Sequence, residues 1–326
     1  MLEFYTYNLA TKSPLYKQRT GVILSYKFHE RTLLAESSPL PGYNQESLQD
    51  VLVQLKKILP YLLKIQSLED FNNWDQSYEL YPSLQFALYS LYYQISNPIN
   101  HPFSIPIRRF IHIPYQDDAS SAKLLDKLTS LPLCNCVKIK LGSYPLEKAI
   151  SLIKSALSIT KVPLILDFNE RWSLEKMQRF CDNFAPTSFE HLEDPLDNPL
   201  DLFALAKTHP HPIALEQGLR LYGIEPFLSL PTLKTCEFKP TIDMPLLRNA
   251  SFLKTLSDFN MKITFSSAYE TAVGLSTIGY LANQIAPLSY HGLDTLSIFE
   301  SNFLFNPIEI TSTHLVIKSY NYTGTA

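Results

Sequence analysis

Residues 163–169 read Pro-Leu-Ile-Leu-Asp-Phe-Asn, and the predicted fold is organised around this stretch. Its aliphatic residues predict a short buried strand, with Asp167 and Asn169 at the carboxyl end. Side chains alternate between the two faces of a strand, so Asp167 and Asn169 point the same way. An apolar strand that ends in a carboxylate is typical of a parallel barrel that presents ligand groups at one end. Taken alone, the stretch fits a strand followed by an Asx turn equally well.

The same arrangement recurs along the chain. Charged residues end five predicted strands at steps of 27, 26, 23 and 23 residues, and they are Lys140, Asp167, Glu193, Glu216 and Lys239. Each step is the length of one βα unit with short loops. Five successive units of this kind predict one (β/α) barrel with a single site on its top face.

The first hundred residues have a different pattern. Strands expected at 2–9, 20–28 and 33–36, followed by helices at 47–63 and from Pro82, predict an α+β capping domain over 1–100. A proline-rich segment, 97–106, leads into a barrel domain over 101–326, whose C-terminal tail is expected to pack on the cap. The barrel strands are predicted at 109–113, 136–140, 163–169, 188–193, 212–216, 235–239 and 262–266, the helices at 120–130, 145–157, 174–184, 199–207, 223–228, 244–259 and 271–285, and two tail strands at 308–310 and 315–319.

Composition sets the class of protein. The 326 residues are 45% hydrophobic and 18% charged, which is enough apolar material for one large and one smaller domain. A net charge of -3 without a long basic run gives no electrostatic footprint for nucleic acid or an anionic membrane. We see no apolar run of transmembrane length and no signal peptide. The four cysteines are expected to be core thiols, which favours a cytoplasmic location, and no pattern indicates an oligomeric state.

Three carboxylates, Asp167, Glu193 and Glu216, end three successive strands. Crowded together without a cation they would repel, and their pKa values would rise. Three oxygen ligands on a rigid face suit Mg²⁺, with Mn²⁺ as a substitute, while Asn169 could orient a ligand. The alternative is that each is an isolated surface or salt-bridged carboxylate.

Three lysines accompany the carboxylates. Lys138 and Lys140 lie on one face of the second barrel strand, and Lys239 ends the sixth. A neighbouring divalent cation is expected to lower the pKa of these amines, so that one can act as a base. The pattern fits removal of a proton α to a substrate carboxylate, with the metal stabilising the enediolate.

With these residues in place, the sequence resembles the enolase superfamily in its muconate-lactonizing subgroup. Closer motifs resemble the o-succinylbenzoate synthases, namely Glu36-Ser-Ser-Pro-Leu-Pro-Gly42, Phe238-Lys-Pro-Thr241, Ser266-Ser-Ala-Tyr-Glu270 and Gly292-Leu-Asp-Thr295. The resemblance implies an α/β fold, a modified (β/α)8 TIM barrel of the β7α type with an N-terminal α+β cap.

The resemblance also implies a function. This is the Mg²⁺-dependent syn dehydration of 2-succinyl-6-hydroxy-2,4-cyclohexadiene-1-carboxylate to 2-succinylbenzoate, a step of menaquinone biosynthesis. Lys140 would be the base, Lys138 would tune it, and Lys239 would stabilise the anion from the other side. Ser266, Ser267 and Gly292 would lie by the succinyl carboxylate, and the loop 10–19 would close over the ring.

Some features depart from this pattern. Glu216 stands where the family usually has Asp, and Glu237 is expected to face the barrel interior beside Lys138 or Lys239, unless the strand register differs by one. Two alternative functions stay open. One is racemisation of N-succinylamino acids or epimerisation of dipeptides, which would use Lys140 and Lys239 as two bases. The other is a non-catalytic barrel that binds a ligand.

Overall fold

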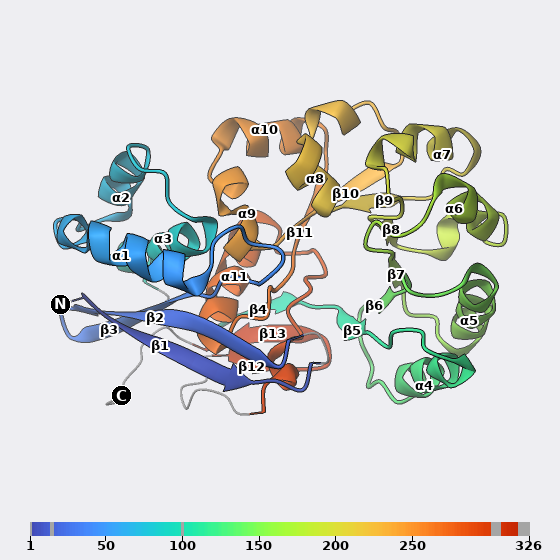
Figure 1. The fold of residues 1–326 in the computed structure, drawn as a ribbon, viewed down its shortest axis with the longest axis horizontal. Coiled ribbons are helices and arrows are strands. Elements are labelled where there is room, and N and C mark those ends of the chain that lie inside the picture. The colour runs from blue at the N-terminus through green and yellow to red at the C-terminus, as the bar shows by residue number, and fades with distance from the viewer. Residues whose placement is uncertain (1, 14–15, 99–100, 301–307, 319–326) are drawn as a thin grey trace.

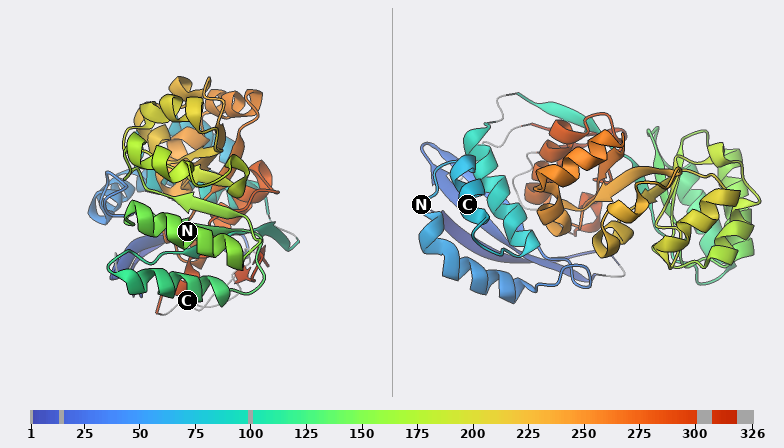
Figure 2. Two further views of the ribbon diagram at one scale, coloured as in Figure 1. Left: turned by 90° about the vertical axis from the view of Figure 1, so that its right-hand side faces the viewer. Right: turned by 90° about the horizontal axis from the view of Figure 1, so that it is seen from above.

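The computed structural model describes residues 2–13, 16–98, 101–300 and 308–318. Pro14 of the expected closing loop, Asn100 of the boundary segment and Ser319 of the last expected strand lie outside the described residues. Figure 1 shows an N-terminal unit in blue beside a larger unit of strands and helices, and Figure 2 shows the two side by side from above.

The N-terminal unit is a three-stranded antiparallel sheet covered by helices. Strands β1 (Leu2–Ala10), β2 (Gln18–Phe28) and β3 (Arg31–Ser37) lie in the order β1-β2-β3. Alternate residues such as Val22 and Leu24 are buried, so one face of the sheet is apolar and packs on helices. The helices are α1 (Leu48–Leu62), α2 (Leu68–Asp75) and α3 (Pro82–Ser96). Ser47 and Asp50 form a capping box that begins α1, whereas α2 was not predicted.

Seven parallel strands form the barrel sheet, in the order β11-β10-β9-β8-β7-β6-β5. They are β5 (Arg109–Ile111), β6 (Val137–Lys140), β7 (Leu164–Asp167), β8 (His191–Glu193), β9 (Ile213–Leu215), β10 (Leu233–Phe238) and β11 (Lys262–Phe265). The helices around them are α4 (Asp118–Thr129), α5 (Leu146–Ile159), α6 (Leu174–Cys181), α7 (Leu202–Thr208), α8 (Gln217–Tyr222), α9 (Pro240–Leu247), α10 (Ala250–Asp258) and α11 (Ala272–Ile285). All seven predicted strands are confirmed.

Two predicted helices are wrong. The helix expected at 223–228 lies earlier, as α8, and begins directly after Glu216, while 225–227 form a 3₁₀ turn. The helix expected at 244–259 is two helices, because the Asn249 side chain accepts hydrogen bonds from the N–H groups of Ser251 and Phe252 and so begins α10.

A two-residue segment closes the barrel between its first and last strands. His291 pairs in parallel with Ile107, next to β5, and Gly292 pairs in parallel with Ser266, at the end of β11. The Arg108 N–H donates to the His291 carbonyl at 3.0 Å, and the Gly292 N–H donates to the Phe265 carbonyl at 2.8 Å. This pair of residues takes the place of an eighth strand.

The tail adds a third sheet. Strand β4 (Phe103–Pro106) pairs with β13 (His314–Ile317), which pairs with β12 (Ile308–Ile310), all antiparallel. Packing of the tail on the cap, and a domain boundary at residue 100, stay predictions.

Buried charges join the cap to the barrel. The Glu36 carboxylate, on β3, accepts hydrogen bonds from the N–H groups of Thr271 and Gly274 at the start of α11, at 2.9–3.1 Å. The Arg19 guanidinium, on β2, donates to the carbonyls of Ala268 and Tyr269 at 3.1 and 3.2 Å. The loop between β11 and α11 is therefore held by two cap side chains.

Candidate active site

The three predicted carboxylates lie at one edge of the barrel sheet. Asp167 ends β7 and Glu193 ends β8, and these two residues pair in register. Glu216 follows β9 directly and precedes α8. All three side chains are buried. The Asp167 side chain also accepts a hydrogen bond from the Asn169 N–H at 3.0 Å, so the strand end is an Asx turn as well as a carboxylate site.

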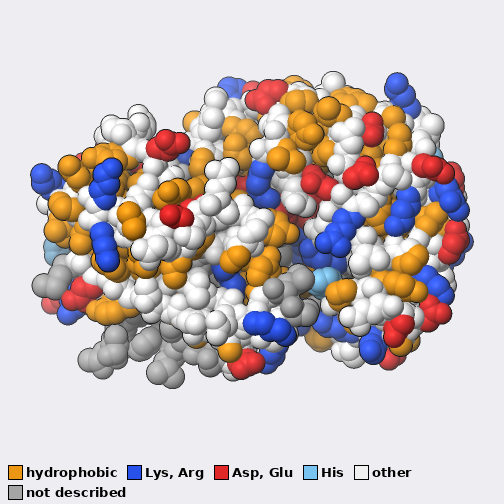
Figure 3. Space-filling model, in the orientation of Figure 1, with side chains coloured by type: hydrophobic (Ala, Val, Ile, Leu, Met, Phe, Trp, Pro, Cys, Tyr) orange, Lys and Arg blue, Asp and Glu red, His pale blue; other side chains and the backbone are white. Residues whose placement is uncertain are grey.

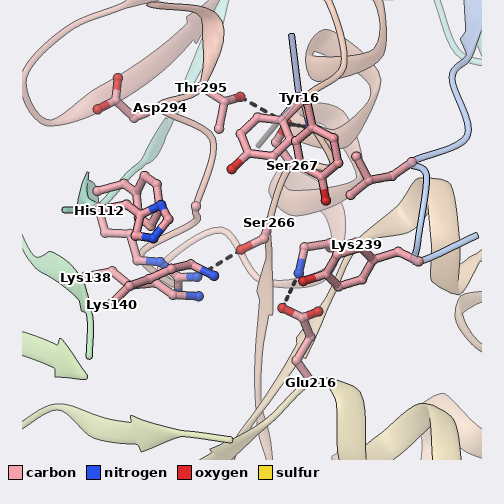
Figure 4. A pocket seen from close by; sticks show the side chains of 16 residues that line it. Tyr16, His112, Lys138, Lys140, Glu216, Lys239, Ser266, Ser267, Asp294 and Thr295 are labelled. Atoms are coloured by element: carbon pink, nitrogen blue, oxygen red, sulfur yellow. Dashed lines mark hydrogen bonds and ion pairs between the residues drawn. The ribbon is translucent and has the colours of Figure 1, made fainter. Parts of the chain in front are cut away.

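Lysines neutralise the carboxylates. The Lys138 ammonium lies 3.1 Å from Asp167 Oδ2 and also contacts the Glu193 carboxylate, while the Lys140 ammonium lies 3.3 Å from Asp167 Oδ2. Lys140 donates a second bond to Asn169 Oδ1 at 2.8 Å. Across the pocket Lys239 donates to Glu216 (Figure 4). The two faces of the pocket therefore each present a lysine.

The pKa of each carboxyl group follows its nearest charges. Burial alone would raise the pKa of Asp167, but Lys138 and Lys140 outweigh it and lower the pKa to about 2. Burial would also raise the pKa of Glu216, but the positive charges of Lys239 and Arg220 outweigh it and lower this pKa to about 2. Glu193 differs, because burial and the nearby Glu237 carboxylate raise its pKa well above the usual value. Of the three predicted carboxylates, Glu193 is therefore the one whose pKa is raised, as expected for crowded carboxyl groups.

The neighbouring carboxylates raise the pKa values of Lys138 and Lys140, and the fall expected beside a divalent cation stays a prediction. Burial opposes the charged form of Lys138, but Asp167, Glu193 and Glu237 together raise its pKa well above the ordinary value. Asp167 also raises the pKa of Lys140 against the effect of burial. Both lysines are thus held as ammonium ions by the carboxylates that were predicted to bind a cation.

The donor set fits a divalent cation. Glu193 Oε2 is buried without a hydrogen-bond partner among the described atoms, and Asp167 Oδ2 has ion-pair contacts only. Within the described part of the chain, His191, Glu193 and Glu237 are the three potential ligands whose donor atoms all lie within 4.8 Å of one another. The predicted ligands Asp167 and Glu216 are both outside this set, and the Glu216 carboxylate pairs with Lys239 and Arg220 instead. A cation held by all three predicted carboxylates would replace the ammonium groups that now supply their positive charge.

Glu237 faces the barrel interior, as its register predicts. It is fully buried and lies 3.3 Å from the Lys138 ammonium. Its strongest partners were not predicted: the Arg108 guanidinium donates to Oε1, and so does the Ser266 hydroxyl. The expectation that this carboxylate is paired is confirmed.

One pocket brings the barrel lysines together with cap residues. Basic side chains gather in a hollow of the surface shown in Figure 3, and Figure 4 shows the pocket from close by. The cap contributes Tyr16, Leu40 and Tyr43. The barrel contributes Arg108, Phe110, His112, Lys138, Lys140, Glu216, Lys239, Ser266, Ser267, Tyr269, Gly292, Asp294 and Thr295. Of the residues predicted for substrate binding, Ser266, Ser267 and Gly292 line this pocket, whereas Asn169 contacts it through Lys140.

Sequence reasoning missed two barrel residues of the pocket. His112 follows β5, and burial and then Lys140 lower the pKa of its imidazole to about 4, so it is neutral at pH 7. Arg108 precedes β5 and is almost fully buried. His112 could have been predicted, because it follows its strand at the position where other barrel strands carry charged groups. Arg108 stands before its strand and gave no such signal.

Comparison with known proteins finds one family model and several sequence relatives. The enolase C-terminal domain-like family matches residues 121–278. The o-succinylbenzoate synthase of Vibrio cholerae serotype O1 (strain M66-2) is 26% identical over 291 residues, which cover 87% of this chain and 84% of that enzyme. The o-succinylbenzoate synthase of Pasteurella multocida (strain Pm70) is 24% identical over 318 residues, which cover 91% of this chain and 90% of that enzyme.

Solved structures share the whole fold. The substrate-liganded L-Ala-D/L-Glu epimerase from Bacillus subtilis superposes with a TM-score of 0.81 at 13% identity, covering 100% of this chain and 99% of that one. MenC from Desulfotalea psychrophila LSv54 superposes with a TM-score of 0.76 at 17% identity, and the match covers 96% of this chain and 98% of that one. The architecture is thus a TIM barrel with an N-terminal antiparallel cap. Together with the sequence relatives, this supports an enzyme, a lyase similar in sequence to the o-succinylbenzoate synthases.

Proposed function

We propose that the chain catalyses the Mg²⁺-dependent syn dehydration of 2-succinyl-6-hydroxy-2,4-cyclohexadiene-1-carboxylate to 2-succinylbenzoate. The observation that carries this proposal is the pocket in which Lys140 and Lys239 face each other beside Asp167, Glu193 and Glu216. The synthases among its sequence relatives support the choice of reaction. The reaction would place the chain in menaquinone biosynthesis, and we keep a cytoplasmic location as part of the proposal. No helix in the described residues combines the length and the apolar character needed to cross a bilayer.

Asp167, Glu193 and Glu216 would hold Mg²⁺, or Mn²⁺ in its place. The bound ion would stabilise negative charge that develops on the substrate carboxylate. Sharing the Asp167 charge with a cation would also weaken the interaction that raises the pKa of Lys140. Lys140 would then be available as a neutral amine.

Lys140 would act as base and then as acid on one face of the ring. Its amine takes the proton from C1, and the electron pair of that C–H bond forms the new C1–C6 double bond as the C6–O bond breaks. The same ammonium returns the proton to the departing hydroxyl, which leaves as water, so no oxidant or reductant is needed. Lys138 would tune the base, and Lys239 would stabilise the anion from the opposite side by its charge.

Asn169 would orient the base. Its Oδ1 accepts a hydrogen bond from the Lys140 ammonium at 2.8 Å. Asn169 has a positive φ of 49°, a left-handed conformation that Asn tolerates better than most residues. The turn conformation thus directs the amide at Lys140.

An ultraviolet assay tests the proposal. Dehydration converts a cyclohexadiene into an aromatic ring, so diene absorbance should disappear with Mg²⁺ and persist after the metal is chelated. No change of absorbance with Mg²⁺ present would contradict the proposed reaction.

A second function fits one observation. Lys140 and Lys239 approach the pocket from opposite sides, an arrangement that also suits two-base racemisation of N-succinylamino acids or epimerisation of dipeptides. Proton exchange of an N-succinylamino acid in deuterium oxide distinguishes the two. Fast exchange and racemisation with negligible dehydration of the cyclohexadiene would favour the racemase.

A further inference from the structure

Arg108 lies in the wall of the pocket with part of its hydrogen-bonding capacity unused. The side chain is buried, and Nη2 donates to Glu237 and to Ser266 Oγ, the latter at 2.9 Å. Nη1 has a weaker bond of 3.4 Å to the Tyr290 carbonyl. The Nε–H group has no hydrogen-bond partner among the described residues. A guanidinium with an unpaired buried donor in a pocket wall is suited to bind an anion.

Gly292 keeps this guanidinium uncovered. A Cβ atom at residue 292 would lie 3.0 Å from Arg108 Nη2, 3.3 Å from Nε and 2.5 Å from Ser266 Oγ. Any larger residue would therefore occupy the space in front of the guanidinium. Because Gly292 also lines the pocket, that space is available to a ligand.

The neighbouring serine hydroxyls already have acceptors. Ser266 donates its hydroxyl proton to Glu237, and Ser267 donates its proton to Glu270 at 2.6 Å. Each serine has one O–H donor, so neither can donate to a ligand without losing its present bond. Arg108 is therefore a better candidate than Ser266 or Ser267 for the direct contact to a carboxylate in this part of the pocket.

The charges of the site indicate that its ligand is anionic. Among the described residues, four cations face four carboxylates in this ion-pair network, namely Lys138, Lys140, Lys239 and Arg108 against Asp167, Glu193, Glu216 and Glu237. The Arg220–Asp243 pair beside them is neutral in itself. A divalent cation adds two positive charges and the neutral Lys140 amine of the proposed reaction removes one, so the site keeps an excess of positive charge that favours an anionic ligand.

We propose that Arg108, anchored by Glu237, binds the second carboxylate of a dicarboxylate substrate and so determines specificity for it. The inference rests on the proposed function in its choice of ligand. Glu237 holds the guanidinium in place, and Gly292 leaves its face open to the pocket.

Calorimetric binding of two probes with Mg²⁺ present tests the inference. The diacid is 2-succinylbenzoate, and the matched monoacid is 2-butanoylbenzoate, in which a methyl group replaces the terminal carboxylate. The unaltered enzyme should bind the diacid about 10- to 100-fold more tightly, the effect of one charge-assisted contact. The double variant Arg108→Met/Glu237→Leu removes both charges together, so that no unpaired buried charge remains. It should bind the two probes with similar affinity.

Two further variants complete the experiment. Arg109→Met alters the adjacent arginine, which pairs with Asp294 and does not line the pocket, and it should keep the diacid preference. Arg108→Lys keeps the charge but lacks the planar fork, so the preference should fall, and this variant serves if the double variant does not fold. Unchanged preference in a folded double variant, or in Arg108→Lys, would overturn the inference.

The outcomes separate this inference from the proposed function. An enzyme that prefers the diacid through Arg108 but fails to dehydrate the cyclohexadiene defeats the proposed reaction and leaves the carboxylate site standing. An enzyme that dehydrates the substrate while the double variant keeps the diacid preference defeats the carboxylate site alone.

Discussion

Glu216 is the carboxylate with the most demanding surroundings. Its carboxylate accepts a hydrogen bond from Lys239 and another, at 3.0 Å, from Arg220 Nη1, and the family resemblance predicts Asp at this position. We expect Glu216→Asp to keep kcat/KM within about tenfold of the original, a loss of about 1.4 kcal/mol, because a carboxylate is still present. Steady-state kinetics at saturating Mg²⁺ measure this.

The alanine variants are the controls. Asp167→Ala, Glu193→Ala and Glu216→Ala should each abolish activity and weaken Mg²⁺ binding by calorimetry, with an unchanged circular dichroism spectrum. Full activity of any one at limiting Mg²⁺ would remove that residue from the ligand set. An inactive Glu216→Asp variant would show that the backbone has adapted to the longer side chain.

Lys140 and Lys239 should respond differently to substitution. Lys140→Ala removes the proposed base and should lower kcat by at least about 100-fold. Lys239→Arg keeps a positive charge and cannot act as a base, so it should retain part of the dehydration and show no racemisation. Stopped ultraviolet assays and chiral chromatography measure the two activities. Equal loss of dehydration in both variants would indicate that Lys239 also transfers a proton.

At the residue scale, the sequence predicted the strand-end positions better than their partners. Five charged groups at regular steps placed the carboxylates and lysines at one edge of the barrel, because a parallel barrel brings all its strand ends together. The same register predicted an inward, paired Glu237. Arg108 was missed because it comes from the opposite end of its strand and reaches the site only through barrel closure.

The elements were predicted where periodicity was strong and missed where side-chain capping decides. The pattern predicted one helix from 244 to 259, yet Asn249 begins a new helix inside it by capping two N–H groups. Helix α8 is only six residues long, too short for a periodic signal. Local hydrogen bonds of this kind are visible in three dimensions and weak in sequence.

Helix α11 depends on a residue from another domain. The Glu36 carboxylate accepts from the N–H groups of Thr271 and Gly274, which would otherwise be unsatisfied and buried. Glu36→Ala should lower the free energy of unfolding by about 3 kcal/mol, since it leaves several buried donors without an acceptor. Chemical denaturation measures the change.

A surface carboxylate provides the comparison. Glu309→Ala removes an exposed partner of Lys318 and should leave the free energy of unfolding nearly unchanged. Similar effects of the two substitutions would contradict the assigned role of Glu36.

The segment that closes the barrel is predicted to be sensitive to acid. His291 Nδ1 accepts from the Phe265 N–H at 3.1 Å, and Nε2 lies 3.0 Å from the Ala286 carbonyl, so the ring is neutral. Burial lowers its pKa to about 4, whereas an unfolded chain has the ordinary value of 6.5. The unfolded state therefore binds more protons between pH 6.5 and 4, and stability falls as the pH falls through this window.

Unfolding of the enzyme and of His291→Asn across pH 4–7 tests this. The contribution of His291 should be about 3 kcal/mol at most, and the variant should show a shallower dependence on pH. Identical slopes for the two proteins would show that His291 does not cause the acid sensitivity.

On the scale of the whole molecule, cap and barrel are expected to unfold together. Arg19 and Glu36 are both buried at the junction and bind backbone groups of the 268–274 segment. Separation of the two units would expose these charges and leave their partners unsatisfied, a cost of several kcal/mol. Calorimetry should give one transition, and Arg19→Met should lower its temperature or divide it in two. Two transitions in the unaltered protein would contradict this coupling.

Closure of the barrel by His291 and Gly292 has a consequence for synthesis on the ribosome. Until these residues have emerged, β5 and β11 are both edge strands, and their unpaired N–H and C=O groups are open to pairing with other chains. The cap and all eleven α-helices of the described residues precede the closing segment, so a nearly complete nascent chain still carries two open edges. Translational pausing before codon 291 should therefore increase the fraction of chains that aggregate or require a chaperone.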